Sequence, residues 1–419
     1  MRLRSRSYPS PALTPALGQP WLKRLCLYSI ILMFVGLGDA IMTYFSPVYI
    51  NRHLNNEMIM GLIIATSSMV GLACDILFGE FFSGKPHSFF LLRSIAVAGL
   101  FSLSFIFFPP LVALLILSMA LWGIYYELIL FSDFHFINHA LDHPHHSLGW
   151  SIIKMFTGLA YLIGPLIAGF LLTFNETFPP LGALVMFLVA FSLFLIFRPR
   201  LDKRSPADIH QTAPKRNLLH EFKVWRLLLP KLWPVMLFIL ILTMMDAAFW
   251  TVGSVLADTM NHGGFLVVAY MLPSLFAGYL AARFSPRYGK KRTAFVTGLI
   301  CGCLFALSGL TAASPLFVIL IFVASIFQGM AMPEIFGAIE DYLERMGHSA
   351  NTLVGLENST TSLAFIIGPI FAGLIASVLS ELLMFSVFGL LIAGISLLAL
   401  LIVPRKIHLP QTALNQVGS

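Results

Sequence analysis

The chain has 419 residues, of which 58% are hydrophobic and only 11% charged, with a mean hydropathy of +0.87. This composition excludes a soluble globular protein, because such domains carry about 25% charged residues. It indicates a polytopic membrane protein, and the formal net charge of +7 needs no nucleic-acid partner because basic residues gather in the loops between apolar segments.

Cysteine usage and nucleotide motifs exclude further classes. The four cysteines lie in or beside apolar segments without metal-site spacing, which predicts neither a disulfide framework nor a thiolate cluster. No Gly-Lys-Ser/Thr phosphate loop is present, so the sequence shows no route to ATP as an energy source. We expect no bound cofactor.

Apolar segments of about 20 residues, the length that crosses a bilayer, predict an all-α protein of twelve transmembrane helices in two pseudo-symmetric six-helix bundles. We expect a disordered basic cytosolic tail over 1–24, an N-terminal bundle over 25–198, a basic cytosolic linker over 199–231, a C-terminal bundle over 232–404 and a cytosolic tail over 405–419. The predicted spans are 25–50, 58–82, 88–108, 111–137, 148–174 and 180–197, then 232–257, 264–284, 293–311, 315–342, 350–377 and 382–403.

The basic residues predict the orientation of these spans. If the N-terminus is cytosolic, all but two of the 26 Lys and Arg residues lie in cytosolic segments, as the positive-inside rule requires. The exceptions are Arg52, outside, and Lys154, within a span. Both termini are therefore expected in the cytosol.

One apolar segment occurs twice with the same spacing. Residues 160–169 read AYLIGPLIAG and residues 364–373 read AFIIGPIFAG. Gly, Ala and Pro are common in membrane helices, but a pattern matched at so many positions, in the fifth and the eleventh span, favours duplication of a six-span unit. We expect these small residues to let helices pack closely. The repeated pairs are Gly164-Pro165 and Gly368-Pro369.

Other landmarks repeat at similar offsets. Asp39 and Asp246 each lie in the first span of a half, and Gly84-Lys85 and Gly289-Lys290 each follow a second span. Two parallel six-span repeats joined by a basic linker are typical of transporters in which two bundles rock about a site at the membrane midplane.

At these residues the chain resembles the major facilitator superfamily, over roughly 22–404. Residues 287–292 read RYGKKR and resemble the Asp-Arg-x-Gly-Arg-Lys loop of the family, with Pro286 at the acidic position. The equivalent loop of the first half keeps Gly84 and Lys85, but has Phe81 and Phe82 at the acidic and Arg positions. The resemblance implies that Arg287, Gly289, Lys290, Gly84 and Lys85 act in gating.

The fifth span is similar to the Gly-Pro motif of the family's antiporters, with Ala160 and Ala168 in place of Gly. The first span, with Pro47 and Tyr49, loosely resembles drug:proton antiporters but has Ile50 where they have a closing Pro. The resemblance implies secondary active transport by alternating access, with export of a small compound.

Four acidic residues within the spans need a reason, because an ionisable side chain in hydrocarbon costs at least about 2.5–3.5 kcal/mol. A carboxyl group removed from water can exchange protons near neutrality, as proton coupling requires. The alternative for each acid is a structural one, in which it only accepts hydrogen bonds. The candidates for proton coupling and substrate recognition are Asp39, Glu127, Asp246 and Glu334.

Aromatic and polar residues beside these acids are candidates for a binding cavity. Spacings of three or four residues place Asp39 with Thr43, and Asp246 with Trp250, on shared helix faces. An acid beside an aromatic ring suits a lipophilic cation, whereas packing or lipid contact is the alternative for any single ring. The cavity candidates are Thr43, Tyr44, Trp122, Tyr126 and Trp250.

Lys154 in the fifth span and Glu357 in the eleventh are nearly equivalent under the repeat but differ in charge. Both lie close to the predicted cytosolic surface, so snorkelling or an ion pair with a loop residue is one interpretation. A cytosolic gate is the other.

A histidine-rich segment joins the fourth and fifth spans, with His135, His139, His143, His145 and His146. A pair at i and i+4 is compatible with a metal, and the spacing resembles a His box of membrane di-iron enzymes. No further boxes follow, so we interpret the segment as an interfacial loop and keep the alternatives of a metal site or a membrane metalloenzyme.

These observations predict proton-coupled export of a small amphipathic or cationic compound by a protein that is not an enzyme. The alternative is a proton-coupled symporter that takes up a sugar, an organic acid or a peptide. We expect a multi-pass protein of the plasma or bacterial inner membrane, active as a monomer, with protons, a small-molecule substrate and the lipid bilayer as partners.

Overall fold

The computed structural model describes residues 20–81, 85–141, 145–201, 218–260, 263–312, 314–346 and 350–404. Twelve of its helices are long and apolar enough to cross a membrane, and the described residues contain no strand. The predicted all-α fold with twelve spans is therefore confirmed. Gly84, residues 202–217 of the linker, most of the N-terminal tail and all of the C-terminal tail lie outside the described residues.

The first half consists of six long helices that follow the predicted spans. Pro47 in the first of them and Pro165 in the fifth are accommodated inside the helix, as bundled membrane helices allow. The helices are α1 (Pro20–Leu54), α2 (Glu57–Phe81), α3 (His87–Phe107), α4 (Val112–Ala140), α5 (His146–Leu172) and α6 (Phe178–Leu201).

The second half repeats this plan with two interruptions. The seventh span is α7 (Leu218–Ala248), a π-helical turn η2 (Phe249–Gly253) and α8 (Ser254–Thr259), and the eighth is α9 (Gly264–Met271) followed by α10 (Ser274–Tyr288) after a break at Pro273. The sequence prediction treated both spans as uninterrupted. The remaining helices are α11 (Lys290–Ser308), α12 (Pro315–Met346), α13 (Ala350–Val378) and α14 (Glu381–Ile402).

Helix α7 begins within the range that the sequence assigned to the linker. Its first turns are amphipathic: Val224 and Leu228 are fully buried, whereas Lys223 and Arg226 are exposed. A hydropathy criterion misses such a segment, because only one face of it is apolar.

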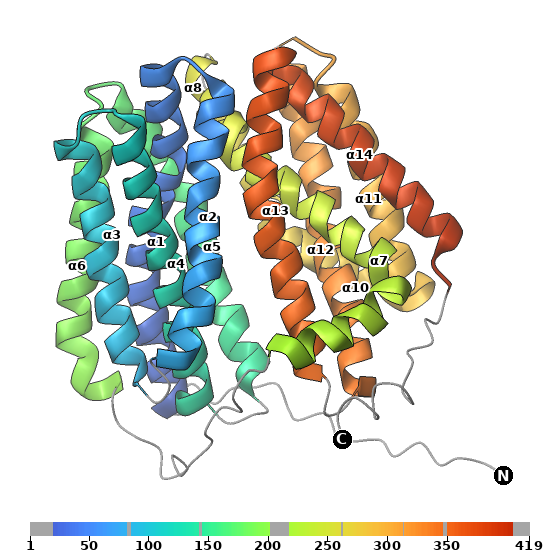
Figure 1. Ribbon diagram of the computed structural model, residues 1–419, viewed down its shortest axis with the longest axis horizontal. Coiled ribbons are helices and arrows are strands. Elements are labelled where there is room, and N and C mark those ends of the chain that lie inside the picture. The colour runs from blue at the N-terminus through green and yellow to red at the C-terminus, as the bar shows by residue number, and fades with distance from the viewer. Residues whose placement is uncertain are drawn as a thin grey trace.

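The two halves lie side by side as separate bundles (Figure 1). Within the first half α1 packs against α5 and α6, and α4 against α2 and α3; within the second, α11 packs against α12 and α14, and α7 against α13. Helix α1 begins, α6 ends and α7 begins at one end of the molecule, as expected for an even number of spans in each half. We call this end the linker end.

The halves are joined at the opposite end. A Cβ atom at Gly61 of α2 would stand 2.2 Å from the carbonyl oxygen of Pro369 of α13, and a Cβ at Gly373 would stand 2.2 Å from that of Glu57. These glycines let the two helices touch through their backbones.

An ion-pair network covers the same end. Arg52 of α1 donates to both carboxylate oxygens of Asp258 on α8, at 2.9 and 2.8 Å, and to Glu176 at 3.1 Å. The pair with Asp258 crosses between the halves. Together with the α2–α13 contact, it holds this end closed.

We predict that Gly61→Leu opens the end opposite the linker. A leucine has no space against the Pro369 carbonyl, and overpacking of this kind costs about 1–3 kcal/mol. Spin labels in the α5–α6 and α13–α14 turns should therefore move apart in double electron–electron resonance measurements. Gly394→Leu is the matched control, because nothing lies within 4 Å of a Cβ at Gly394. An unchanged distance in the Gly61 variant would contradict the assignment of this contact.

Candidate functional site

The carboxylate of Asp39 is buried in the first half and receives hydrogen bonds from two other helices. Trp122 of α4 donates its indole N–H to Oδ1 at 2.8 Å, and the hydroxyl of Tyr161 on α5 donates to Oδ2. The hydroxyl of Tyr126 lies 2.8 Å from that of Tyr161. Because Tyr161 uses its proton toward Asp39, Tyr126 is the donor in this second bond. Asp39 is 3% exposed, so these donors replace the water that an ionised carboxylate needs.

Asp246 is held by an equivalent chain of donors in the second half. Tyr270 of α9 donates to Oδ1 at 2.7 Å, and Gln328 of α12 donates through Nε2 to the Tyr270 hydroxyl at 3.0 Å. The ring of Tyr270 stacks on Phe249 with centroids 3.7 Å apart. Each half thus places one aspartate of its first span against donors from its other spans.

An aromatic contact joins the Asp39 site to the second half. Tyr161, which donates to Asp39, contacts the ring of Trp250 edge-on at 5.7 Å. Trp250 lies in the π-helical turn that begins three residues after Asp246. π-Helical turns are rare in proteins, and those that occur are often found at functional sites. This one brings an aromatic ring of the second half to the Asp39 site.

The repeated Gly-Pro segments position both aspartates. A Cβ at Gly164 of α5 would lie 2.5 Å from the Cβ of Ala40, and one at Gly368 of α13 would lie 2.9 Å from the Cβ of Ala247. Ala40 and Ala247 are the residues that follow the two aspartates. The duplicated motif therefore lets a helix backbone approach the first span of its half where the acid stands.

The other predicted cavity residues have separate surroundings. Thr43 is buried and donates to the backbone carbonyl of Asp39 at 2.8 Å. Tyr44 is buried next to Gly169 of α5. Tyr126 is 36% exposed, so among the residues bonded around Asp39 it offers an accessible ring.

Glu127 and Glu334 lie apart from the two aspartates. Glu127 is half-buried beside Gly71 of α2, and its Oε2 is buried without a hydrogen-bond partner. Glu334 is buried near the linker end, where Ser285 of α10 donates to its Oε2 at 2.5 Å. The structure thus joins Glu334 of α12 to the last turns of α10.

The family-like RYGKKR segment, called the α10–α11 loop below, spans the junction of α10 and α11 at Gly289. Gly289 has a positive φ of 85° and separates α10 from α11, a conformation in which glycine carries no steric cost. Lys290 donates to Asp341 at 2.7 Å and to the carbonyl of Gly337 at 3.0 Å, both on α12. Arg287 is exposed over the ring of Tyr288. The loop is thus tied to α12 of its own half.

The equivalent loop of the first half is described only in part, since Gly84 lies outside the described residues. Lys85 is exposed and stands 5.7 Å from the ring of Phe89, and the guanidinium of Arg93 covers the same ring at 3.4 Å.

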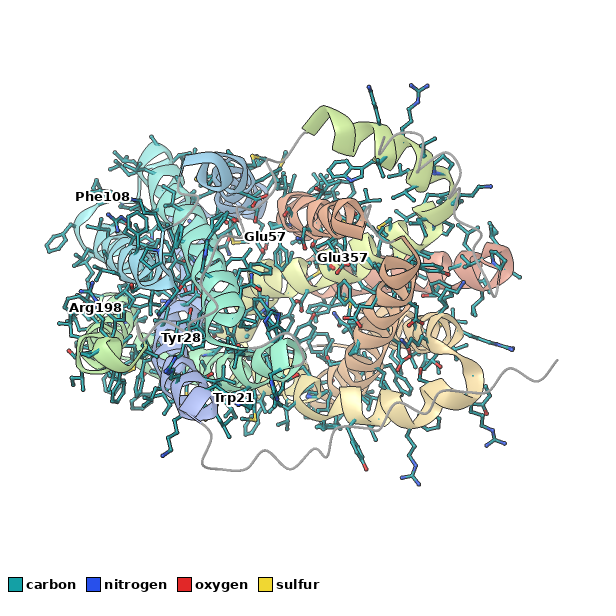
Figure 2. All side chains as sticks on the ribbon, turned by 90° about the horizontal axis from the view of Figure 1, so that it is seen from below. Trp21, Tyr28, Glu57, Phe108, Arg198 and Glu357 are labelled. Atoms are coloured by element: carbon teal, nitrogen blue, oxygen red, sulfur yellow. The ribbon has the colours of Figure 1, made fainter. Side chains whose placement is uncertain are left out.

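Lys154 and Glu357, the two candidates for a cytosolic gate, have separate surroundings in this structure. Among the ion pairs of the described residues, none joins Lys154 and Glu357. Lys154 is exposed, within electrostatic reach of Asp133 on α4. Glu357 is half-buried on α13, on the side of the second half that faces the first (Figure 2).

The histidine-rich segment does not gather into a metal site within the described residues. His135 stacks on Phe90 at 5.1 Å, and His145 packs against Trp21 at 4.6 Å. No group of three or more His, Cys, Asp or Glu in the described part of the chain is placed to hold a metal. The side chain of His139, and all of His143, lie outside that part.

Sequence reasoning missed Tyr161, Tyr270 and Gln328. A comparison of the two repeat copies could have identified Tyr161. The second copy has Phe365 at the equivalent position and therefore lacks the hydroxyl group. Gln328 is an amide within an apolar span, which also needs a hydrogen-bonding role. Nothing in the spacing of Tyr270 pairs it with Asp246.

Comparison with known proteins agrees with this architecture. Residues 235–417 match the family model described as Major Facilitator Superfamily. The chain is thus similar to this family over its second half. It is a multi-pass integral membrane protein, and no curated protein sequence matches it.

Two solved structures share this fold over nearly the whole length of the chain. One is a bacterial homologue of the human lysosomal transporter Spinster in an inward-facing, unoccupied conformation, with 12% identity over 92% of this chain and 96% of that one and a TM-score of 0.65. The other is a point mutant of the nucleoside transporter NupG, with 13% identity over 96% of this chain and 100% of that one and a TM-score of 0.70. At this level of identity the likeness concerns the fold alone.

We predict that Gly164→Ala and Gly368→Ala both destabilise the protein. Each added methyl group would press on the helix that carries an aspartate, at a cost of about 1–3 kcal/mol. Thermal unfolding of the purified variants should show lowered midpoints. Gly158→Ala, on the same helix as Gly164, is the control because the nearest atom to its Cβ is 3.4 Å away. Equal midpoints for the Gly158 and Gly164 variants would contradict the proposed role of the Gly-Pro segments.

Proposed function

We propose that the protein is a proton-coupled secondary transporter that works by alternating access and exports a small amphipathic or cationic compound. The observation that carries this proposal is the pair of aspartates in equivalent spans, each held by donors of its own half, with the Tyr161–Trp250 contact joining the Asp39 site to the second half. Rocking of two bundles about such a site exposes it to one side of the membrane at a time.

The donors around Asp39 give a physical basis for coupling. Trp122 and Tyr161 stabilise the ionised carboxylate through charge-assisted hydrogen bonds, which are worth about 1.5–3 kcal/mol each. Both donors come from other helices, so a rearrangement of α4 or α5 that lengthens either bond favours protonation of the acid. Tyr161 also contacts Trp250 of the second half, so rocking of the two halves changes the surroundings of this donor and with them the proton affinity of Asp39.

Among the other acids we propose Glu127 and Asp246 as further coupling groups. The buried Oε2 of Glu127 has no partner in this conformation, and a buried unpaired carboxylate oxygen favours the protonated form. Glu334 is bonded to Ser285 close to the linker end. Its place supports a role in holding the α10–α11 loop against α12, together with Lys290.

The surroundings of Asp39 suit a cation with an apolar body. Trp122, Tyr126, Tyr161 and Trp250 present aromatic rings around a single carboxylate, and ring faces attract organic cations. A cationic substrate and a proton would compete for the same negative charge, which is the requirement for exchange of one for the other.

The distribution of basic residues supports a cytosolic linker end, with both termini in the cytosol. In this orientation the contact between Arg52 and Asp258 closes the external side. We further propose that the chain acts as a monomer in the plasma or bacterial inner membrane, with six-helix bundles over 25–198 and 232–404.

A second candidate is proton-coupled uptake of a polar nutrient. Gln328 is 8% exposed, and its Oε1 has no hydrogen-bond partner. An amide oxygen left unpaired costs about 1–3 kcal/mol, which a hydroxyl or N–H of a substrate would recover. One protein of the same fold is described as a nucleoside transporter, a class of substrate that carries such donors.

We predict that Asp39→Asn abolishes coupling. The measurement is uptake into proteoliposomes with pH gradients of either sign. Ethidium is the probe for transport of a cationic compound, and uridine is the probe for transport of a nutrient. The asparagine cannot exchange a proton, so flux of the transported probe should no longer depend on the pH gradient.

Glu334→Gln is the matched control for this experiment. It removes a buried carboxylate of the other half without touching the Asp39 network, so gradient-driven flux should persist. Unaltered coupling in the Asp39 variant, or flux in the parent protein that ignores the gradient, would contradict proton coupling at Asp39.

A further inference from the structure

The first turns of α7 form an amphipathic segment at the linker end of the second half. In Figure 1 the first part of α7 runs across the linker end of the bundle, and the rest of the helix then runs alongside the other spans. Figure 2 shows this first part at the edge of the molecule. Pro230 and Pro234 lie inside α7. Each removes a backbone hydrogen bond, which accounts for the bend between the two directions.

One face of the segment is packed against the protein. Val224, Leu228 and Leu232, spaced by four residues, are all fully buried. Helix α7 packs against α13 and α14. The segment is thereby fixed to the bundle, and its opposite face is turned outward.

The outward face combines two cations with large apolar side chains. Lys223 and Arg226 are exposed one turn apart, and Leu229 and Trp233 follow at 46% and 40% exposure. At 100° per residue Arg226 lies next to Trp233 on the helix surface, and Lys223 lies on the far side of Arg226 from the apolar pair. The face therefore changes from apolar to cationic around the helix.

We propose that this face, defined by Lys223, Arg226, Leu229 and Trp233, binds anionic phospholipid headgroups of the leaflet at the linker end. The order of side chains around the helix, from apolar to cationic, matches the change in polarity across the membrane interface. Leu229 and Trp233 reach the boundary of the acyl chains, and the two cations reach the phosphate layer. Basic amphipathic helices with tryptophan at the border lie in the interface in this way.

The place of the segment favours lipid over another protein as the occupant. It stands at the edge of a bundle whose outer surface carries many exposed apolar side chains, such as Leu397 at 50% and Leu401 at 77% on α14. The segment lies where this lipid-facing surface ends, at the linker end. Lipid headgroups lie at the same depth in the membrane. The proposal does not depend on which substrate is transported.

The test is a lipid titration of the full chain by native mass spectrometry, with dioleoyl phosphatidylglycerol, dioleoyl phosphatidylcholine and free glycerol phosphate as separate probes. The parent protein should bind phosphatidylglycerol more tightly than phosphatidylcholine. Each cation near a membrane surface is worth about 1 kcal/mol, so Lys223→Gln and Arg226→Gln should each raise the apparent Kd for phosphatidylglycerol about fivefold and leave that for phosphatidylcholine unchanged.

Two further variants keep the result interpretable. Arg283→Gln removes an exposed cation near the end of α10 and should leave both constants unchanged, whereas Trp233→Ala should weaken both lipids alike. A parent protein without preference for phosphatidylglycerol would overturn the proposal, as would a double variant that retains it. Competition by free glycerol phosphate would show an ion site instead. A dimer that Trp233→Ala dissociates would show a protein interface.

Discussion

The hydrogen bonds from Trp122 and Tyr161 to Asp39 are the interaction on which the rest of the site depends. A carboxylate that is 3% exposed within a membrane bundle is tolerated only where polar groups replace water. The donors come from α4 and α5, so the carboxylate links three helices of the first half. A close approach of α5 to α1 is needed for this geometry, and Gly164 against Ala40 supplies it.

In the second half, different residues provide the hydrogen bonds to the aspartate of the first span. Asp246 is held through Tyr270 and Gln328 of α9 and α12, and Gly368 against Ala247 repeats the close approach. The backbone plan of the duplication is thus retained while the polar groups differ. The π-helical turn after Asp246, which has no counterpart among the described helices of the first half, brings Trp250 to Tyr161. This asymmetry places aromatic rings of both halves at one boundary.

Much of this architecture could be predicted from the sequence. Hydropathy identified all twelve spans, and the repeated Gly-Pro pattern identified two helices that approach the acid-bearing spans. Asp39 and Trp122 were both singled out, because an acid and a tryptophan within apolar runs are conspicuous. Their direct bond was not predictable, since it depends on how α1 and α4 are rotated. The break in the eighth span and the bend of α7 both coincide with prolines. Membrane helices also keep prolines inside them, as at Pro165 of α5, so the sequence alone did not show which proline would break or bend a helix.

The central claim is that Asp39 exchanges a proton when a substrate enters. It is tested most directly by adding ethidium to purified protein in weakly buffered detergent and following released protons with a pH-sensitive dye. The account predicts release from the parent protein and none from Asp39→Asn, with release retained in Glu334→Gln. Equal release from the parent and the Asp39 variant would contradict it.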